Sequence, residues 1–204
     1  MKKTLFGLCA ATAVAFGGSA DAAIFINEIH YDNAGGDVGE FVEIVTTASE
    51  DASLIVLSLY NGSDSELYGS NDTFTVSSDF TDHGVLADGF NYYSILISGI
   101  QNGSPDGLAV SFDGTVQEFF SYEGTIAAAG DGPAVGLAST DIGVSETSST
   151  PIGSSLQRID FGSTWALTEE TNTRGAINVI PEPASLALVG LGGLVMLGRG
   201  RRQA

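Results

Sequence analysis

The stretch GLAVSFDGTVQEFFSY, residues 107–122, carries the clearest β-hairpin pattern in the chain. Apolar side chains alternate along both of its halves, as they do in strands with one buried face. They are Leu108, Val110 and Phe112 before the turn, and Val116, Phe120 and Tyr122 after it. Between the halves, Asp113-Gly114 favours a two-residue hairpin turn. We therefore predict antiparallel strands over residues 107–113 and 115–122.

Similar short runs, rich in β-branched and aromatic residues, lie upstream of this hairpin. Residues 23–30, 40–46, 54–60, 67–76 and 90–98 are the predicted strands, and Gly, Asn, Asp and Ser separate them. The pair Asn61-Gly62 marks a second hairpin after residues 54–60. About seven short strands with turns at this spacing, and no long stretch of helical period between them, predict an all-β sandwich.

The sequence after the hairpin divides into two parts. Residues 124–155 are rich in Gly, Ala, Ser and Thr and poor in large apolar side chains, which predicts a long surface excursion. An irregular flap and an extra edge strand are both open for part of it, because structureless loops of this length are uncommon. Core-like sequence returns at residues 155–159 and 164–167. There we expect Trp165, the only tryptophan, to be buried.

Residues 1–22 have the organisation of a secretory signal peptide. Two lysines precede an apolar run over residues 5–16, and small residues follow it. Ala20 and Ala22 supply the small side chains required for cleavage before Ala23, and cleavage after Ala20 is the alternative. The apolar run is too short to cross about 30 Å of hydrocarbon comfortably, which argues against an N-terminal membrane anchor.

The predicted domain, residues 23–180, is strongly acidic. The single cysteine, Cys9, lies in the signal peptide, so we expect the domain to fold by burial without disulfides. The domain contains 23 acidic residues and only two basic ones, Arg158 and Arg174, which gives a formal charge of −21. Such a surface repels a phosphate backbone, so nucleic acid is excluded as a partner. Solubility outside the cell explains the charge, and binding of a divalent cation is the alternative.

Two segments near the start of the domain resemble the lamin tail domain family. They are IFINEIHYDN at residues 24–33 and GEFVEI at residues 39–44. Segments typical of the bacterial extracellular branch follow, namely LYNG (59–62), NGSPDG (102–107), SYEG (121–124), SLQR (155–158) and GAIN (175–178). The resemblance implies an immunoglobulin-like β-sandwich over residues 23–180, which agrees with the strand pattern. It implies little about activity, because similar domains occur alone on secreted proteins or attached to extracellular nucleases.

The C-terminal residues 181–204 resemble the PEP-CTERM sorting signal that exosortases recognise. The signal has three parts: a Pro-Glu-Pro motif, an apolar run over residues 184–198, and a basic end. Its defining residues are Pro181, Glu182 and Pro183, followed by Arg199, Arg201 and Arg202. We predict that the apolar run forms a hydrophobic transmembrane helix, and that the arginines stay on the cytoplasmic side. The resemblance implies that the inner membrane holds the protein transiently before an exosortase-type enzyme processes it. A plain membrane anchor is the alternative reading.

Residues 23–180 show no catalytic constellation. They contain two histidines, His30 and His83, and no Gly-x-Ser-x-Gly motif. Two arginines are too few for the charge neutralisation that phosphoryl transfer requires. We interpret Glu28, Glu40 and Glu43 as structural residues rather than as a carboxylate pair for sugar hydrolysis. We therefore predict that the protein is not an enzyme and has no catalytic residue.

The sequence suggests one leading calcium site, and His30 as a metal ligand and the group Asp79, Asp82 and Asp88 are the alternatives. Asp32, Asn33, Asp37 and Glu40 surround Gly35-Gly36, and calcium binds several oxygen ligands from a flexible loop. The spacing does not match an EF-hand, and a solvated Gly-Gly turn explains the same residues. No other cofactor is expected.

These observations predict an exported protein of the cell envelope, cell surface or extracellular matrix with a non-catalytic structural, adhesive or binding domain. Exopolysaccharide or matrix components are its expected partners. The alternative is a secreted metal-dependent hydrolase, resembling a phosphodiesterase or nuclease, or the accessory domain of one.

Overall fold

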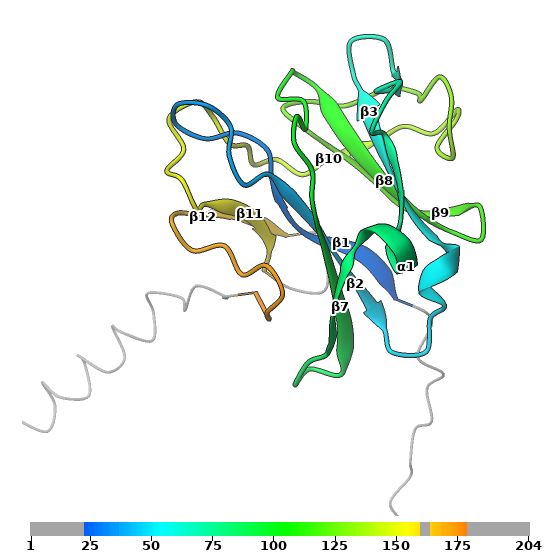
Figure 1. Cartoon of the computed structure of the whole chain (residues 1–204). Coiled ribbons are helices and arrows are strands. Elements are labelled where there is room, and N and C mark those ends of the chain that lie inside the picture. Colours follow the sequence, from blue (N-terminus) through cyan, green and yellow to red (C-terminus); the bar gives the residue numbers. More distant parts are fainter. Residues whose placement is uncertain (1–22, 160–163, 179–204) are drawn as a thin grey trace, which may run out of the picture.

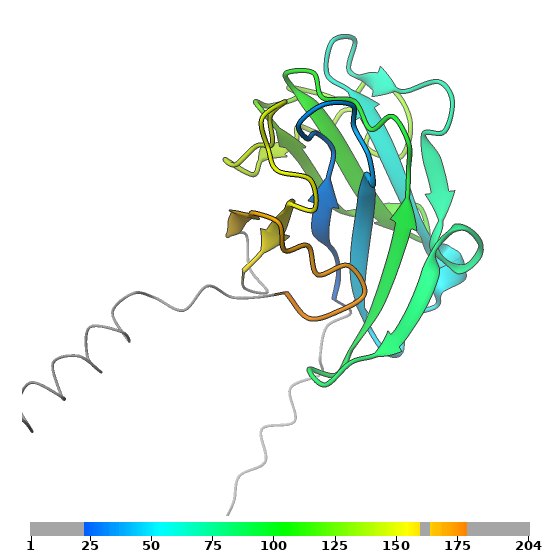
Figure 2. The same cartoon turned by 60° about the vertical axis from the view of Figure 1, so that its left-hand side comes forward.

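The computed structural model describes residues 23–159 and 164–178, which form two β-sheets packed face to face (Figures 1 and 2). The longer strands are β1 (Ile24–His30), β2 (Phe41–Thr47), β3 (Ile55–Asn61), β7 (Phe90–Leu96), β8 (Asp106–Phe112) and β9 (Thr115–Tyr122). The shorter ones are β4 (Glu66–Leu67), β5 (Thr73–Thr75), β6 (Thr81–Val85), β10 (Thr140–Asp141), β11 (Ser155–Arg158) and β12 (Trp165–Thr168). Two helical turns, η1 (Ala52–Leu54) and α1 (Val76–Asp79), complete the described elements.

Each of the two sheets has its own strand order. The first, here called the β1 sheet, has the strand order β12-β11-β1-β2-β7-β6. The second, the β8 sheet, has the order β10-β9-β8-β3-β4, and β5 also pairs with β3. Neighbouring strands are antiparallel apart from β10, which runs parallel to β9. The prediction of an all-β sandwich is confirmed.

The core lies between the sheets, where the alternating apolar residues of both sheets meet. Ile26, Ile29 and Ile44 come from the β1 sheet, and Leu57 and Leu108 from the β8 sheet; all five side chains are fully buried. An irregularity in the pairing of β1 with β2, between Ile26 and Glu28, lets Ile26 and Ile29 both face this core although they are three residues apart. Glu28 consequently lies outside the cluster of buried apolar residues.

The predicted hairpin at residues 107–122 is confirmed. Phe112 pairs with Thr115 across Asp113 and Gly114, whose φ angles of 45° and 74° are those of a primed two-residue turn. Strand β3 is also followed by a hairpin to β4, although its loop is longer than two residues because Asn61 pairs with Glu66.

The prediction of one strand over residues 67–76 is wrong. This segment contains the end of β4, all of β5 and the start of α1. Gly69 and Asn71 have positive φ angles of 80° and 51°, which interrupt the extended backbone between the two short strands. Strand β6 was not predicted, because Val85 is its only large apolar residue and its pairing with β7 defines it.

The excursion after β9 covers the outer face of the β8 sheet. Ile126, Ala129 and Ala134 are buried against Tyr60 and Phe119, so a second apolar cluster forms outside the main core. The same excursion contributes β10 at the edge of the β8 sheet, so the extra edge strand, one of the two alternatives that the sequence allowed, is present. Trp165 is 7% exposed, which confirms the prediction that its side chain is buried.

Several sequence predictions lie outside the described residues. They are the signal peptide with Ala20 and Ala22, and the sorting tail with its apolar run. Within residues 23–159 and 164–178, no helix has the length and apolar character needed to cross a membrane.

Candidate functional site

Buried and partly buried carboxylates hold distant segments of this domain together by accepting backbone N–H groups. Glu40 Oε2 accepts from Gly99 N at 2.8 Å, and Glu118 Oε2 accepts from Ile26 N at 2.9 Å. Asp106 accepts from the amides of Gly62 and Gly103, at 3.0 and 2.7 Å. A domain with two arginines cannot pair most of its acids with basic side chains, and charge-assisted bonds to amides are strong substitutes. Some of the acidic residues therefore stabilise the fold from inside the domain, in addition to those that lie on its surface.

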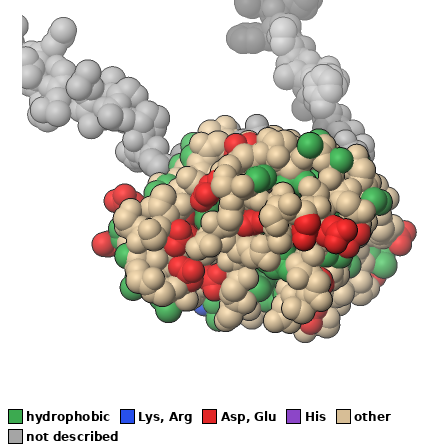
Figure 3. Space-filling model, turned by 90° about the horizontal axis from the view of Figure 1, so that it is seen from above, with side chains coloured by type: hydrophobic (Ala, Val, Ile, Leu, Met, Phe, Trp, Pro, Cys, Tyr) green, Lys and Arg blue, Asp and Glu red, His purple; other side chains and the backbone are tan. Residues whose placement is uncertain are grey.

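The surface of the domain is correspondingly acidic. On the face seen in Figure 3, red carboxyl groups are spread among apolar and other side chains, and almost no blue is visible. This distribution disfavours dense polyanions as ligands on that face.

Glu146 is another buried acid that connects distant segments. Its side chain is fully buried, and its two oxygens accept from Tyr31 N at 2.6 Å and Asp32 N at 3.0 Å and contact His30 Nδ1 at 2.8 Å. Burial lowers the pKa of His30, but the hydrogen bond and the charge of Glu146 outweigh it and raise that pKa. Glu146 thus ties the excursion after β9 to the end of β1.

Glu28 and Glu43 bind the segment that precedes the sorting tail. The two residues are direct neighbours on β1 and β2, and both side chains are fully buried. Glu28 accepts from Thr173 N at 2.8 Å, and Glu43 accepts from Gly175 N at 2.5 Å. Asn178 then donates to the backbone oxygen of Arg158 at 2.7 Å. We call residues 171–178 the C-terminal stem; its contacts hold the last described residues of the domain against β1 and β2.

This carboxylate pair gives the stability a pH dependence. Burial raises the pKa of Glu43 from its ordinary value of 4.5 to about 8, and burial also raises the pKa of Glu28. The folded state therefore binds more protons than the unfolded chain between pH 4.5 and 8, so the contribution of this pair to stability is fully present below about pH 4.5 and is lost as pH rises toward 8. We expect the melting temperature to fall by on the order of 5 °C from pH 5 to pH 8.5.

Thermal unfolding followed by circular dichroism across this pH range measures the effect. Glu43→Gln is expected to flatten the dependence, whereas Glu169→Gln, at an exposed position, should leave it unchanged. A melting temperature that rises with pH in the wild-type protein would contradict the assignment.

The four residues of the predicted calcium site do not converge as one set of ligands. Burial, followed by the nearby Asp37 carboxyl, raises the pKa of Asp32, and Asp37 Oδ1 accepts from Asn33 N at 3.4 Å. Asn33 Oδ1 instead accepts from Val38 N at 3.0 Å, and Glu40 binds Gly99 as described. Among the described residues, no three His, Cys, Asp or Glu side chains are arranged to hold a metal ion. Calcium binding in the 32–40 loop stays a prediction.

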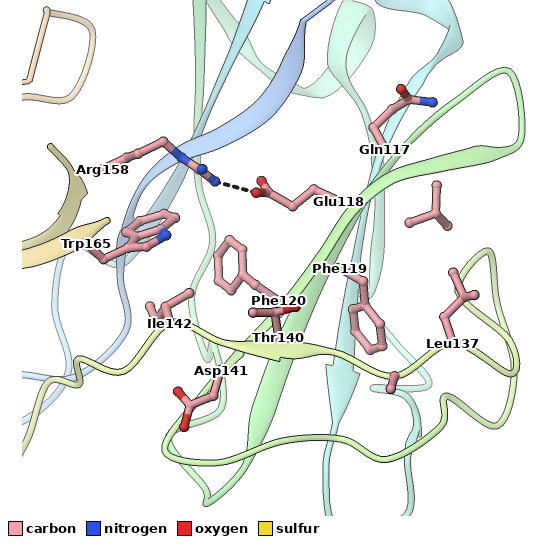
Figure 4. Close-up of a pocket in the computed structure, with 12 residues that line it drawn as sticks. Gln117, Glu118, Phe119, Phe120, Leu137, Thr140, Asp141, Ile142, Arg158 and Trp165 are labelled. Carbon is pink, nitrogen blue, oxygen red and sulfur yellow. Dashed lines mark hydrogen bonds and ion pairs between the residues drawn. The ribbon is translucent and has the colours of Figure 1, made fainter. Parts of the chain in front are cut away.

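A cleft of about 460 Å³ opens between β9 and the β11–β12 hairpin (Figure 4). Arg158 and Glu118 form an ion pair at one end, and the guanidinium carbon of Arg158 lies 4.9 Å from the ring centre of Trp165. Phe120 meets Trp165 edge-on, with ring centres 5.1 Å apart. The polar groups at this end are thus engaged with one another, and the aromatic rings belong to the core rather than to an exposed platform.

Residues 179–202 match the family described as the PEP-CTERM protein-sorting motif. The chain carries an exosortase sorting motif. The match spans Pro181, Glu182, Pro183, Arg199, Arg201 and Arg202, and it indicates an exported protein that the membrane holds transiently before an exosortase processes it. Neither the curated proteins nor the solved structures gave a match. The lamin tail resemblance is not tested by these comparisons and stays a prediction.

Two functional contributors escaped the sequence analysis. Glu146 lies in a segment without apolar periodicity, and its partners at the end of β1 and just after it precede Glu146 by about 115 residues. Arg174 was counted among the charges, but its place in the stem depends on the bonds of its neighbours Thr173 and Gly175 to Glu28 and Glu43, which no local pattern shows.

Proposed function

We propose that this is a non-catalytic structural, adhesive or binding module of the cell envelope or extracellular matrix, delivered by the sorting system that its tail specifies. The observation that carries the proposal is the use of the buried carboxylates. Glu28, Glu40, Glu43 and Glu146 would be the obvious acids for hydrolysis, and each accepts a backbone amide that stabilises the fold. A general acid or base must instead be free to exchange its proton with a substrate.

Activity assays test this proposal against the hydrolase alternative. The purified mature protein is expected to show background rates on phosphodiester, phosphomonoester and glycoside substrates with added Mg²⁺, Ca²⁺ or Zn²⁺. Turnover that Glu40→Ala or His30→Ala abolishes, in a variant that keeps its β-sheet circular dichroism spectrum, would establish an enzyme instead.

The sorting tail should be removed in the native host. We expect cleavage near Pro183, because Pro-Glu-Pro cannot continue a helix and leaves an extended substrate in front of the apolar run. The exported protein would lose about 2 kDa, given 21.0 kDa for 204 residues. It would then be released or joined to a surface carrier.

Intact-mass analysis of the protein from its host measures this loss. Glu182→Ala is expected to leave the uncut form in the membrane, while Glu169→Ala, in the folded domain, should be processed normally. Retention of residues 199–204 in wild-type cells with a working exosortase would show that the tail is a simple anchor.

A further inference from the structure

A second hollow, with a volume of about 400 Å³, lies where the C-terminal stem passes the ends of β1, β2 and β7. Val38, Leu96 and Ile152 line it, and these side chains are 50%, 59% and 61% exposed. Phe41 and Arg174 line the hollow with them. Three aliphatic side chains exposed to this extent around one concave surface are a feature of binding sites rather than of ordinary solvated surface. We call it the Arg174 groove.

Arg174 gives the groove its charge. Its guanidinium carbon lies 5.8 Å from the ring centre of Phe41, a cation–π distance. Within the described residues, Arg174 makes neither a hydrogen bond nor an ion pair, and it is exposed. The other arginine, Arg158, is buried and paired with Glu118. Arg174 is therefore the only exposed Lys or Arg side chain in residues 23–159 and 164–178.

Glu43 does not neutralise this guanidinium by direct contact. Glu43 lies close enough for the charge of Arg174 to lower its pKa, against the larger effect of burial. The oxygens of Glu43, however, accept from Asn27 and Gly175, at 2.8 and 2.5 Å. The N–H groups of Arg174 remain available to a ligand.

The walls of the groove are held in place by bonds to buried groups. Val38 N donates to Asn33 Oδ1, and the Val38 carbonyl lies 3.3 Å from His30 Nε2. On either side of Arg174, the amides of Thr173 and Gly175 are bound by Glu28 and Glu43 as described. A site that is already ordered loses little conformational entropy when a ligand binds.

The chemistry of the groove defines its ligand. A guanidinium binds a carboxylate through two parallel hydrogen bonds, and the aliphatic rim favours apolar neighbours on the same ligand. The formal charge of −21 on residues 23–180 repels densely charged polyanions. We propose that the Arg174 groove binds an extended acidic–apolar peptide, with one carboxylate on Arg174 and aliphatic or prolyl side chains against Val38, Leu96 and Ile152. This deepens the proposed binding role and does not depend on processing of the tail.

A suitable probe is the peptide acetyl-Val-Ile-Pro-Glu-Pro-amide, which places one carboxylate between aliphatic and prolyl side chains. Titrated into the purified mature protein, it is expected to give saturable amide shifts in nuclear magnetic resonance spectra, clustered at Val38, Leu96, Ile152 and Arg174. Arg174→Ala should weaken binding about tenfold, and so should replacing the glutamate of the peptide with glutamine. Ile152→Ala should weaken it by a smaller factor.

Val135→Ala is the matched control, because Val135 is 59% exposed but lies in the excursion that covers the β8 sheet. This variant should bind the probe as the wild type does. Equal affinity of the wild-type protein for the glutamate and glutamine peptides would overturn the proposal without requiring any protein variant. Shifts centred on the cleft of Figure 4, or tighter Arg174-dependent binding of a galacturonate oligomer than of the peptide, would also overturn it. None of these outcomes would contradict a non-catalytic, sorted module.

Discussion

Replacing Glu146 with alanine is expected to lower the free energy of unfolding by about 3–5 kcal/mol, because the change breaks a buried charged network and leaves its partners unpaired. The amides of Tyr31 and Asp32 would lose their acceptor, and His30 would lose the carboxylate at its Nδ1. The fully buried position of Glu146 gives water little access to replace those bonds.

Equilibrium unfolding in urea measures this effect. Glu146→Gln keeps one acceptor oxygen without the charge, so its loss should be smaller than that of Glu146→Ala. Glu169→Ala, at an exposed position, should change stability by less than about 0.5 kcal/mol. A loss below about 1 kcal/mol for Glu146→Ala would mean that the network contributes little to the folded state.

Trp165→Ala should destabilise the domain by a similar amount, about 3–5 kcal/mol, for a different reason. The indole packs against Phe120 in the core and lies under the guanidinium of Arg158. Its removal leaves a cavity at the edge of the sandwich and exposes the Arg158–Glu118 pair to water. The same urea experiment applies, followed by circular dichroism because the variant has no tryptophan.

Two further variants test whether the loss of packing explains the effect of Trp165→Ala. Trp165→Phe fills most of the space and should cost less than Trp165→Ala, and Val135→Ala, at an exposed site, should be nearly neutral. A change below about 0.5 kcal/mol for Trp165→Ala would show that the indole is not part of the core.

The strands that could be predicted are those whose own residues carry the alternation. Residues 107–122 contain both strand faces and the turn, so their hairpin follows from local sequence. Strand β6 could not be predicted in this way, because Thr81–Val85 has little apolar character and becomes a strand only beside β7. At residues 67–76 a continuous strand was expected, although left-handed residues within the segment divide it.

The candidate sites were harder to predict than the strands, because they are formed by contacts between residues that are far apart in the sequence. Glu28 and Glu43 could be interpreted as structural from sequence, but their partners Thr173 and Gly175 lie 145 and 132 positions away. The sequence also grouped Asp32, Asn33, Asp37 and Glu40 by proximity along the chain. In the fold, Glu40 binds Gly99 instead, since a side chain at the start of a strand can reach across the sheet to a neighbouring loop. The spacing of acidic residues along the chain does not show which of them bind backbone amides elsewhere in the fold instead of a metal ion.

The position of the C-terminal stem has a mechanical consequence for a surface-attached form. Tension applied at the C-terminus would reach Asn178 first, then Gly175 and Thr173, before it reached any strand. Each is held by separate side-chain contacts, so the bonds would break one after another at low force rather than together. Release of the eight stem residues would add roughly 27 Å of extended chain before β12 carried the load. The stem would thus lengthen under flow or shear while the sandwich stayed folded, and it could bind again when the force fell.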